Sequence, residues 1–145
     1  MKIVRADSSH LESWLKLRVA LWPDEKANLA EDLPIMPRNN SLLNLVALAD
    51  NGDVIGFAEA SLRRDYVNGC ATSPVGFLEG IYVEPAHRKT GVARSLVKAV
   101  AEWSRTQGCA EFASDSLIEN TDSHRMLKAL GFKEAECVVY FRKLL

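Results

Sequence analysis

The residues with the clearest chemical potential form a basic turn, Arg88-Lys89-Thr90-Gly91-Val92-Ala93. It follows a strand-like segment and Pro85, and it opens a helix-like segment. The N-terminus of a helix has free backbone N–H groups and the positive end of the helix dipole, and together these bind phosphate groups. Because Gly91 and Ala93 have little or no side chain, a pyrophosphate can approach the backbone closely. The turn therefore predicts a phosphate-binding site.

The charge around this turn favours the same interpretation. Residues 84–105 contain five Lys or Arg residues and two Glu residues, in a chain of net charge -1. Arg88, Lys89 and Arg94 are placed to neutralise phosphate. The pattern is neither a P-loop, which ends in Gly-Lys-Ser/Thr, nor a dinucleotide fingerprint, which has three glycines. An ordinary basic first turn packed on a sheet remains the alternative.

Two acidic residues stand near the ends of predicted strands, among apolar neighbours. Glu79 lies within Phe77–Ile81, and Asp115 follows Phe112–Ser114. Acids are uncommon inside strands, so both are candidates for a functional site. The alternative is that Glu79 points to solvent and Asp115 caps a turn.

Composition limits the classes of partner. The 145 residues are 48% hydrophobic and 26% charged, as in one soluble globular domain spanning 1–145. The near-neutral charge argues against nucleic acid or an anionic membrane as the main partner. The start of the chain shows no hydrophobic signal core, so we expect a cytoplasmic location. Cys70, Cys109 and Cys137 match neither a disulfide framework nor a metal site.

The sequence predicts an α+β (α/β) fold, a central sheet with helices on both faces. The predicted order is β-α-α-β-β-β-α-β-α-β. The first helix is capped by Ser8 or Ser9 and is stopped by Pro23. The expected segments are strands Lys2–Arg5, Asn44–Ala49, Val54–Arg64, Gly76–Val83, Glu111–Ser114 and Ala135–Arg142, and helices from about Ser8 to Trp22, Asp24–Leu33, Gly91–Thr106 and Thr121–Leu130.

With these elements in order, the chain resembles the GCN5-related N-acetyltransferase (GNAT) superfamily. The resemblance rests on Gly80-Ile81-Tyr82-Val83-Glu84-Pro85 followed by residues 87–93, and on Asn120 with Leu130-Gly131-Phe132. It implies a mixed, mostly antiparallel sheet and acetyl-CoA as cosubstrate, with no metal. It also implies the cofactor-binding residues Ile81, Val83, Arg88, Lys89, Thr90, Gly91, Val92, Ala93, Arg94 and Asn120.

The resemblance also implies how the reaction proceeds. A protonated amine must lose a proton to a carboxylate or a water relay, and a backbone N–H must stabilise the thioester oxygen. If the strands of Glu79 and Asp115 are adjacent and splay apart, both carboxylates face one cleft. Residues 22–36 carry a net charge of -3 and residues 111–122 a net charge of -4. We therefore infer a polycationic acceptor, although a solvated acidic face is the common alternative.

Several longer runs resemble a narrower group, the aminoglycoside 6'-N-acetyltransferases of the chromosomal enterobacterial and Acinetobacter type. The longest run is Thr72 to Val83, and others are Tyr66–Gly69, Glu111–Asp115 and Val138–Phe141. The implied reaction acetylates the 6'-amine of the drug and confers antibiotic resistance. The implied substrate-binding residues are Trp22, Tyr66, Glu79, Asp115 and Glu136, the two aromatic rings packing against sugar rings and the acids binding ammonium groups. The implied assembly is a homodimer.

One position departs from the superfamily pattern. Many members have a tyrosine seven residues after the asparagine, and it protonates the departing thiolate; here that position is Leu127. Either Tyr66 or a water takes the role, or the thiolate leaves unaided, since thiol pKa values lie near 8.5. Glu79, Asp115 and Tyr66 are thus the catalytic candidates. A polyamine or protein-amine acetyltransferase, and a non-catalytic acetyl-CoA sensor, remain alternatives.

Overall fold

The computed structural model describes residues 1–25 and 40–145. The predicted helix Asp24–Leu33 lies almost wholly outside them; its first two residues belong to a 3-10 turn, Pro23–Glu25. The other elements are β1 (Lys2–Arg5), η1 (Ser8–His10), α1 (Leu11–Leu21), β2 (Leu42–Leu48), β3 (Val54–Arg63), β4 (Val75–Val83), η4 (Pro85–His87), α3 (Val92–Thr106), β5 (Phe112–Ser114) and α4 (Thr121–Ala129).

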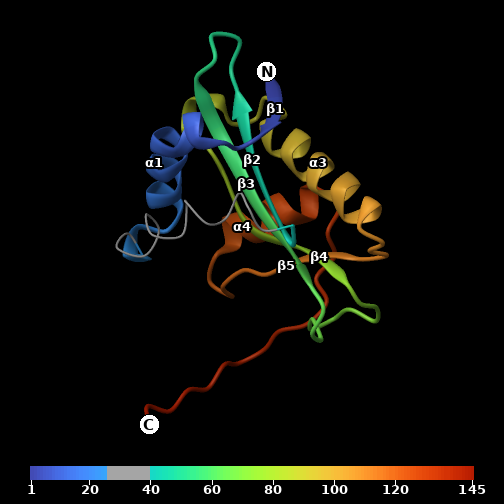
Figure 1. The fold of residues 1–145 in the computed structure, drawn as a ribbon. Helices are drawn as coiled ribbons and strands as arrows, with labels where there is room; N and C mark the ends of the chain where they lie inside the picture. The colour runs from blue at the N-terminus through green and yellow to red at the C-terminus, as the bar shows by residue number, and fades with distance from the viewer. Residues whose placement is uncertain (26–39) are drawn as a thin grey trace.

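The five strands form one sheet in the order β1-β2-β3-β4-β5 (Figure 1). The first four are antiparallel neighbours, and β5 runs parallel to β4. The sheet is therefore mixed and mostly antiparallel, as predicted. The turn between β2 and β3 begins at Asp50 and contains Gly52 at φ +91°, a conformation that favours glycine. Each strand thus pairs with the next strand along the chain, and the connection from β4 to β5 runs through α3.

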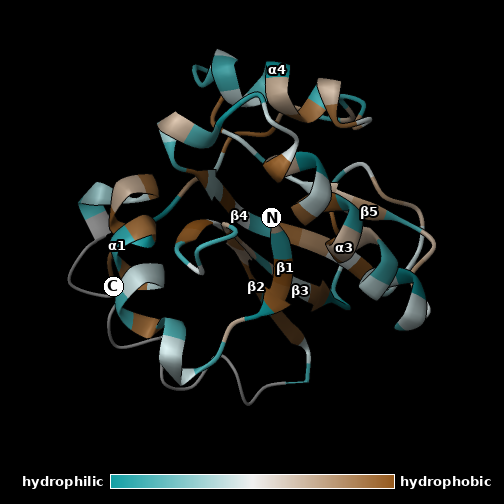
Figure 2. Ribbon diagram, turned by 90° about the horizontal axis from the view of Figure 1, so that it is seen from above, coloured by the Kyte–Doolittle hydropathy of each residue, from teal (hydrophilic) through white to brown (hydrophobic). Residues whose placement is uncertain are grey.

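Helices cover both faces of the sheet, as the sequence predicted; α1 lies on one side and α3 on the other (Figure 2). The apolar face of α3 packs on β2, β3 and β4 in the larger core. Leu127 of α4 and Leu130, which follows that helix, pack against this core. A smaller core joins α1 to the opposite face through Trp14, Val46 and Phe57. Among the described residues no helix combines the length and the apolar content that a membrane span requires.

The start of the first helix differs from the prediction that Ser8 or Ser9 caps it. The side chain of Asp7 accepts from the backbone N–H of Ser9 and caps the 3-10 turn η1, while the side chain of His10, the N-cap of α1, accepts no cap bond. A carboxylate accepts more strongly than a hydroxyl, so Asp7 takes this position. The helix ends at Leu21, just before Pro23, as expected.

The predicted last strand, Ala135–Arg142, is wrong within this chain. Residues 133–145 form no strand and run away from the body of the molecule as an extended arm (Figure 1). Its β-branched and aromatic side chains have the composition of a strand, but a strand exists only where a neighbour supplies ladder hydrogen bonds. Tyr140 and Phe141 consequently stand 83% and 92% exposed.

Candidate active site

The strands β4 and β5 pair only at the start of β4. Their parallel register joins Gly76 to Phe112, Phe77 to Ala113 and Leu78 to Ser114, while β4 continues to Val83. The hydroxyl of Ser114 donates to the carbonyl of Leu78 at 2.9 Å and closes this short ladder. Beyond Leu78, no residue of β5 pairs with β4.

Glu79 occupies a bulge in β4 at this point. Its neighbours Gly80 and Leu78 pair with Glu59 and Ala60, which are consecutive residues of β3, so Glu79 is the extra residue. A bulge re-aims side chains locally, and such bulges are frequent beside active sites. Leu78 and Ser114 form the last pair between β4 and β5, so Glu79 and Asp115 each stand one residue beyond that pair. The two predicted acids therefore lie at the point where the β4–β5 ladder ends.

Trp22, the first predicted aromatic wall, lies on the same stretch of β4. A Cβ built on Gly80 would come within 2.4 Å of the Trp22 ring, so the indole rests directly on the backbone there. The ring also meets Phe57 edge-on at 6.1 Å between centroids. Trp22 is partly exposed, so one of its surfaces is available above Gly80.

A buried ion pair sits beneath Trp22. The Nε of Arg18 lies 2.6 Å from Oε1 of Glu59, and the indole Nε1 of Trp14 donates to the same carboxylate at 3.0 Å. Both charged side chains are 4% exposed. The guanidinium of Arg18 lies 5.5 Å from the centre of the Trp22 ring. Partners on all sides make this buried charge tolerable, and the cluster fixes the end of α1 over the sheet.

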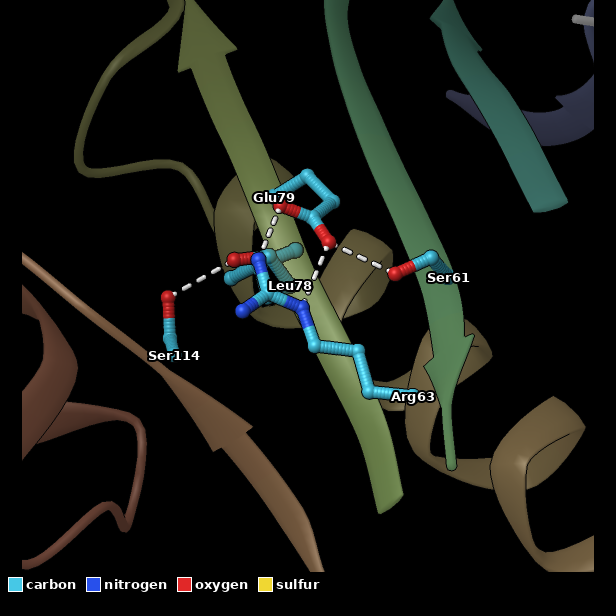
Figure 3. A network of polar contacts seen from close by, with 5 residues as sticks. All are labelled: Ser61, Arg63, Leu78, Glu79 and Ser114. Atoms are coloured by element: carbon cyan, nitrogen blue, oxygen red, sulfur yellow. Dashed lines mark hydrogen bonds and ion pairs between the residues drawn. The ribbon is translucent and has the colours of Figure 1, made fainter. Parts of the chain in front are cut away.

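The carboxylate of Glu79 is bound by two side chains that the sequence analysis did not select (Figure 3). Arg63 donates from Nε at 3.0 Å and from Nη2 at 2.8 Å, and the Ser61 hydroxyl donates at 2.6 Å. The sequence of β3 did contain a pattern that could have marked them. Glu59, Ser61 and Arg63 occupy every second position and so share one face of the strand, while apolar residues stand between them. Pairing them with Glu79 required the register of the bulge, which no sequence pattern shows.

The other two predicted substrate-binding residues lie farther along the chain's surface. Tyr66 is in the loop after β3 and is 73% exposed. Glu136 lies in the extended arm and accepts from Nδ2 of Asn68 at 3.2 Å. Glu136 is therefore brought to the loop that carries Tyr66.

That loop is tied to the start of β5 by Glu111. Its Oε1 accepts from the backbone N–H groups of Ala71 and Thr72 at 2.9 and 2.7 Å, and from the Thr72 hydroxyl at 2.5 Å. The hydroxyl bond of Thr72, followed by the two N–H bonds, holds the pKa of Glu111 below its ordinary value. Two of the acids in the run 111–122 thus already have partners within the chain: Glu111 binds the loop after β3, and Asp122 is paired with Arg125.

The predicted cofactor turn has the expected backbone. Lys89 and Gly91 adopt positive φ angles of 63° and 91°, and Gly91 is the N-cap of α3. A Cβ at Gly91 would meet nothing within 4 Å, so the space above this helix start is open. Left-handed residues before a helix turn successive N–H groups toward one point, which suits a phosphate. The donor set therefore fits a pyrophosphate.

The predicted basic residues of the turn are not equivalent. Arg88 donates from Nε to the carbonyl of Val83 at 2.8 Å and lies over the Tyr82 ring at 5.2 Å, so it braces the end of β4. Thr90 donates to the carbonyl of His87 at 2.5 Å, and Arg94 to that of Ala129 at 3.2 Å. Lys89 is exposed at the turn itself. Among these side chains, Lys89 is the best placed for counter-charge.

The remaining predicted cofactor residues line the path from β4 to α4. Ile81 and Val83 follow the bulge, and their side chains join the larger core. Both residues pair with β3, and the Val83 carbonyl accepts from Arg88. Asn120 is the N-cap of α4, where its Oδ1 accepts from the N–H of Ser123 at 3.2 Å. Its amide donors are not engaged by that cap bond.

The cysteines have no catalytic features in the structure. Burial raises the pKa of Cys70, with a further contribution from Glu111, and burial also raises the pKa of Cys109. Both thiols are therefore poor nucleophiles at neutral pH. The side chains of residues 1–25 and 40–145 include no cluster suited to holding a metal ion.

Relatives of this chain are known by sequence. An aminoglycoside N(6')-acetyltransferase type 1 from Salmonella enteritidis is 48% identical over 145 residues, which are 99% of each chain. A protein of the same name from Acinetobacter haemolyticus is 46% identical over 143 residues, which are 99% of this chain and 98% of the relative.

Solved structures agree with the fold. The apo crystal structure of the aminoglycoside 6'-N-acetyltransferase AAC(6')-IG from Acinetobacter haemolyticus matches with a TM-score of 0.96 and 46% identity, covering 100% of this chain and 99% of the other. The structure of AAC(6')-Iy with the bisubstrate analogue CoA-S-monomethyl-acetylneamine matches with a TM-score of 0.93 and 46% identity, covering 99% and 98%. The model of the acetyltransferase (GNAT) family matches residues 8–132. The superfamily resemblance is thus confirmed, and the chain belongs to the acetyltransferase (GNAT) family.

Proposed function

We propose that this protein is an aminoglycoside 6'-N-acetyltransferase, which transfers the acetyl group of acetyl-CoA to the 6'-amine of an aminoglycoside and thereby confers resistance. The observation that carries the proposal is the position of Glu79 and Asp115, each one residue beyond the last pair between β4 and β5. Two acids at this point suit an acceptor with several ammonium groups. The names of relatives that match over their whole length support the same acceptor.

Acetyl-CoA, when bound, supplies the acetyl group as a thioester. We assign its pyrophosphate to residues 88–94, where the start of α3 presents N–H groups and Lys89 a positive charge. Main-chain groups of Ile81 and Val83 hold the arm that carries the acetyl group. Asn120 holds the pantetheine part through its amide donors.

The acids serve the chemistry of the amine. An aliphatic amine is mostly protonated at neutral pH, so it must lose a proton before its nitrogen can attack the thioester carbonyl. We assign that proton to Glu79 or Asp115, directly or through a water. A backbone N–H of residues 79–83 stabilises the negative charge that develops on the thioester oxygen.

The departing thiolate is not protonated by a tyrosine at position 127, as it is in many members of the superfamily. Leu127 packs against the larger core, so the residue at that position contributes packing and no proton. Tyr66 is 73% exposed on its loop, where its hydroxyl is accessible to a bound molecule. We assign the proton to Tyr66 or to a water; the thiolate is also a tolerable leaving group unaided.

Binding of the drug uses aromatic surfaces and charge together. Trp22 offers the exposed surface of its ring above Gly80, and Tyr66 offers a second ring; sugar rings pack against such faces. Glu79, Asp115 and Glu136 bind ammonium groups by charge-assisted hydrogen bonds. Acetylation of the 6'-amine removes one positive charge and blocks hydrogen bonds at the drug's ribosomal target.

A thiol-release assay tests the proposal directly. The protein is incubated with acetyl-CoA and kanamycin or tobramycin, and free CoA thiol is followed against the hydrolysis background. Turnover well above that background is expected. A parallel panel of polyamines and peptide amines identifies a different acceptor if the drugs are not turned over. Acetyl-CoA binding without turnover of any amine would indicate a sensor instead.

The assembly we propose is a homodimer formed through the arm 133–145. Val138 to Phe141 combine strand propensity with exposed apolar side chains. The sheet ends at β5, whose outer edge lies open to a further strand. A second copy of the same chain offers both an arm and an edge, so reciprocal pairing satisfies both copies.

We place the reaction in the cytoplasm, where acetyl-CoA and the ribosome are found.

A further inference from the structure

The carboxylate of Glu79 already holds a cation that belongs to this chain. The guanidinium of Arg63 donates to both of its oxygens, at 3.0 and 2.8 Å, in the two-bond geometry typical of arginine–carboxylate pairs (Figure 3). The Ser61 hydroxyl donates to Oε1 at 2.6 Å. An ammonium group that binds Glu79 must therefore displace Arg63 or share the carboxylate with it.

Arg63 is built into its place by the sheet. It is the last residue of β3, and Ser61 lies two residues before it on the same face of that strand. The guanidinium carbon lies 3.5 Å from the centre of the Phe77 ring, which adds a cation–π contact. Phe77 and Glu79 come from the neighbouring strand β4. The charge is thus positioned by an ion pair and by an aromatic face together.

The ion pair is nevertheless open to exchange. The Arg63 and Glu79 side chains are 42% and 34% exposed, so water and solutes reach both. Ion pairs with this exposure contribute little net free energy and are screened by salt. The guanidinium can keep its contact with Phe77 while it gives up one or both bonds to Glu79. This differs from the Arg18–Glu59 pair, whose side chains are 4% exposed.

We propose that Arg63 is a specificity-determining residue that competes with the acceptor for Glu79. This rests on the proposed function, because Glu79 must be an ammonium-binding group there. A tethered cation acts at a high effective concentration, so a free monoamine competes poorly against it. An acceptor with several ammonium groups can bind through Asp115 and Glu136 while Arg63 stays on Glu79, whereas a single amine depends on Glu79 and must displace Arg63. The residue thereby selects polycations and discriminates against single amines.

The test compares two acceptors that share the reactive amine. One is tobramycin, and the other is 6-amino-6-deoxyglucose, which has a single amine. Calorimetry measures the affinity of each for the wild-type protein and for R63M, whose unbranched side chain keeps contact with Phe77 but carries no charge. We expect the preference for tobramycin over the monoamine to fall about threefold to fivefold in R63M, the size expected from an exposed ion pair.

Matched variants separate this effect from general loss of charge or structure. Arg64 is the next residue, and its charge acts on the Cys109 thiol, so R64M removes the same charge without freeing Glu79. R64M should leave the preference unchanged. In an E79Q background, R63M should no longer change the preference for tobramycin. The neutral side chain at position 79 then carries no negative charge for which Arg63 and the acceptor could compete. Melting temperatures of all variants report folding separately.

An unchanged preference for tobramycin in R63M would overturn the role of Arg63. If both affinities also fell by the same factor, Arg63 would be a support for Glu79. Turnover of tobramycin by the wild-type protein decides the proposed function independently, because the affinities are measured without turnover.

Discussion

The backbone of Gly80 lies directly against the indole ring of Trp22, so that a Cβ at position 80 would come within 2.4 Å of a ring atom. Gly80 follows the bulged Glu79 in β4, and Trp22 follows the last residue of α1. The absence of one side chain thus lets the end of a helix settle beside the proposed catalytic strand. The acceptor site we propose depends on this close contact.

G80A should move Trp22. The added methyl group forces the ring or the strand aside, and overpacking of this kind costs roughly 1–3 kcal/mol of stability. Because Trp22 is the proposed wall for a sugar ring, KM for tobramycin should rise more than kcat falls. Urea unfolding and steady-state kinetics measure the two effects.

The companion variant W22F removes the clash. A phenyl ring is smaller than an indole, so G80A should cost less stability in W22F than in the wild type, a non-additive pair. If the two substitutions add independently, the Trp22 ring is not what position 80 excludes.

D115A should affect the acceptor and spare the cosubstrate. Asp115 follows Ser114, the last residue of β5 that pairs with β4, and we assign it to the amine. Loss of a group that accepts a proton lowers kcat/KM for the drug by about a hundredfold or more. The dissociation constant of acetyl-CoA, measured by calorimetry, should change little. Equal losses in both quantities would instead mark Asp115 as structural, and D115N then tests whether shape alone suffices.

G91V should produce the opposite pattern. Gly91 has φ +91° at the start of α3, and we place the pyrophosphate over it. Valine there strains the backbone and covers the phosphate position, so acetyl-CoA affinity should fall at least tenfold while drug affinity in the absence of cosubstrate persists.

A matched control is available at Gly52. It has the same φ of +91°, also has no atom within 4 Å of a built Cβ, and lies in the β2–β3 turn away from α3. G52V should lose comparable stability, about 1–2 kcal/mol from the left-handed backbone, and keep acetyl-CoA affinity. If G52V weakens acetyl-CoA as much as G91V does, the effect is strain and not occlusion.

The parts of the fold that depend on local pattern were predictable. Alternation and helical spacing located β1 to β5 and the helices α1, α3 and α4 to within a few residues, because each element satisfies its own backbone groups or pairs with a sequence neighbour. The start of α3 at Gly91 was predictable for the same reason, since a helix start needs no distant partner. The prediction of a final strand was wrong, because Ala135–Arg142 has strand composition but pairs with no strand among residues 1–25 and 40–145.

The interior of the site depended on register and was not predictable. The sequence marked Glu79 as unusual, but its pairing with Arg63 follows from the bulge between Leu78 and Gly80. Similarly, Arg88 carries the positive charge that a phosphate ligand needs. Its Nε donates instead to the carbonyl of Val83, which lies within hydrogen-bond distance. Side-chain partners across strands are set by tertiary geometry, which the order of residues does not state.

Glu111 should make stability depend on pH. Bonds from the Thr72 hydroxyl and from the Ala71 and Thr72 N–H groups lower its pKa in the folded state from the ordinary value of 4.5. A lowered folded pKa stabilises the fold above pH 4.5, and this contribution is lost as the pH falls through the folded pKa. Melting temperatures of the wild type and E111Q should therefore differ at neutral pH and converge in acid. A difference that stays constant with pH would exclude this linkage.

Removal of the arm should separate assembly from the fold of the monomer. Val138 and Val139 are 47% and 77% exposed, Tyr140 and Phe141 even more, so they stabilise little within their own chain. Burying such a side chain against a second copy contributes about 1.5–3 kcal/mol. A chain ending at Ala135 should sediment as a monomer with a melting temperature that no longer depends on protein concentration, whereas the full chain should be a dimer. The double substitution Y140S/F141S, which keeps the arm's length, should weaken the dimer in the same direction. A full-length chain that is monomeric at high micromolar concentration would refute pairing through the arm.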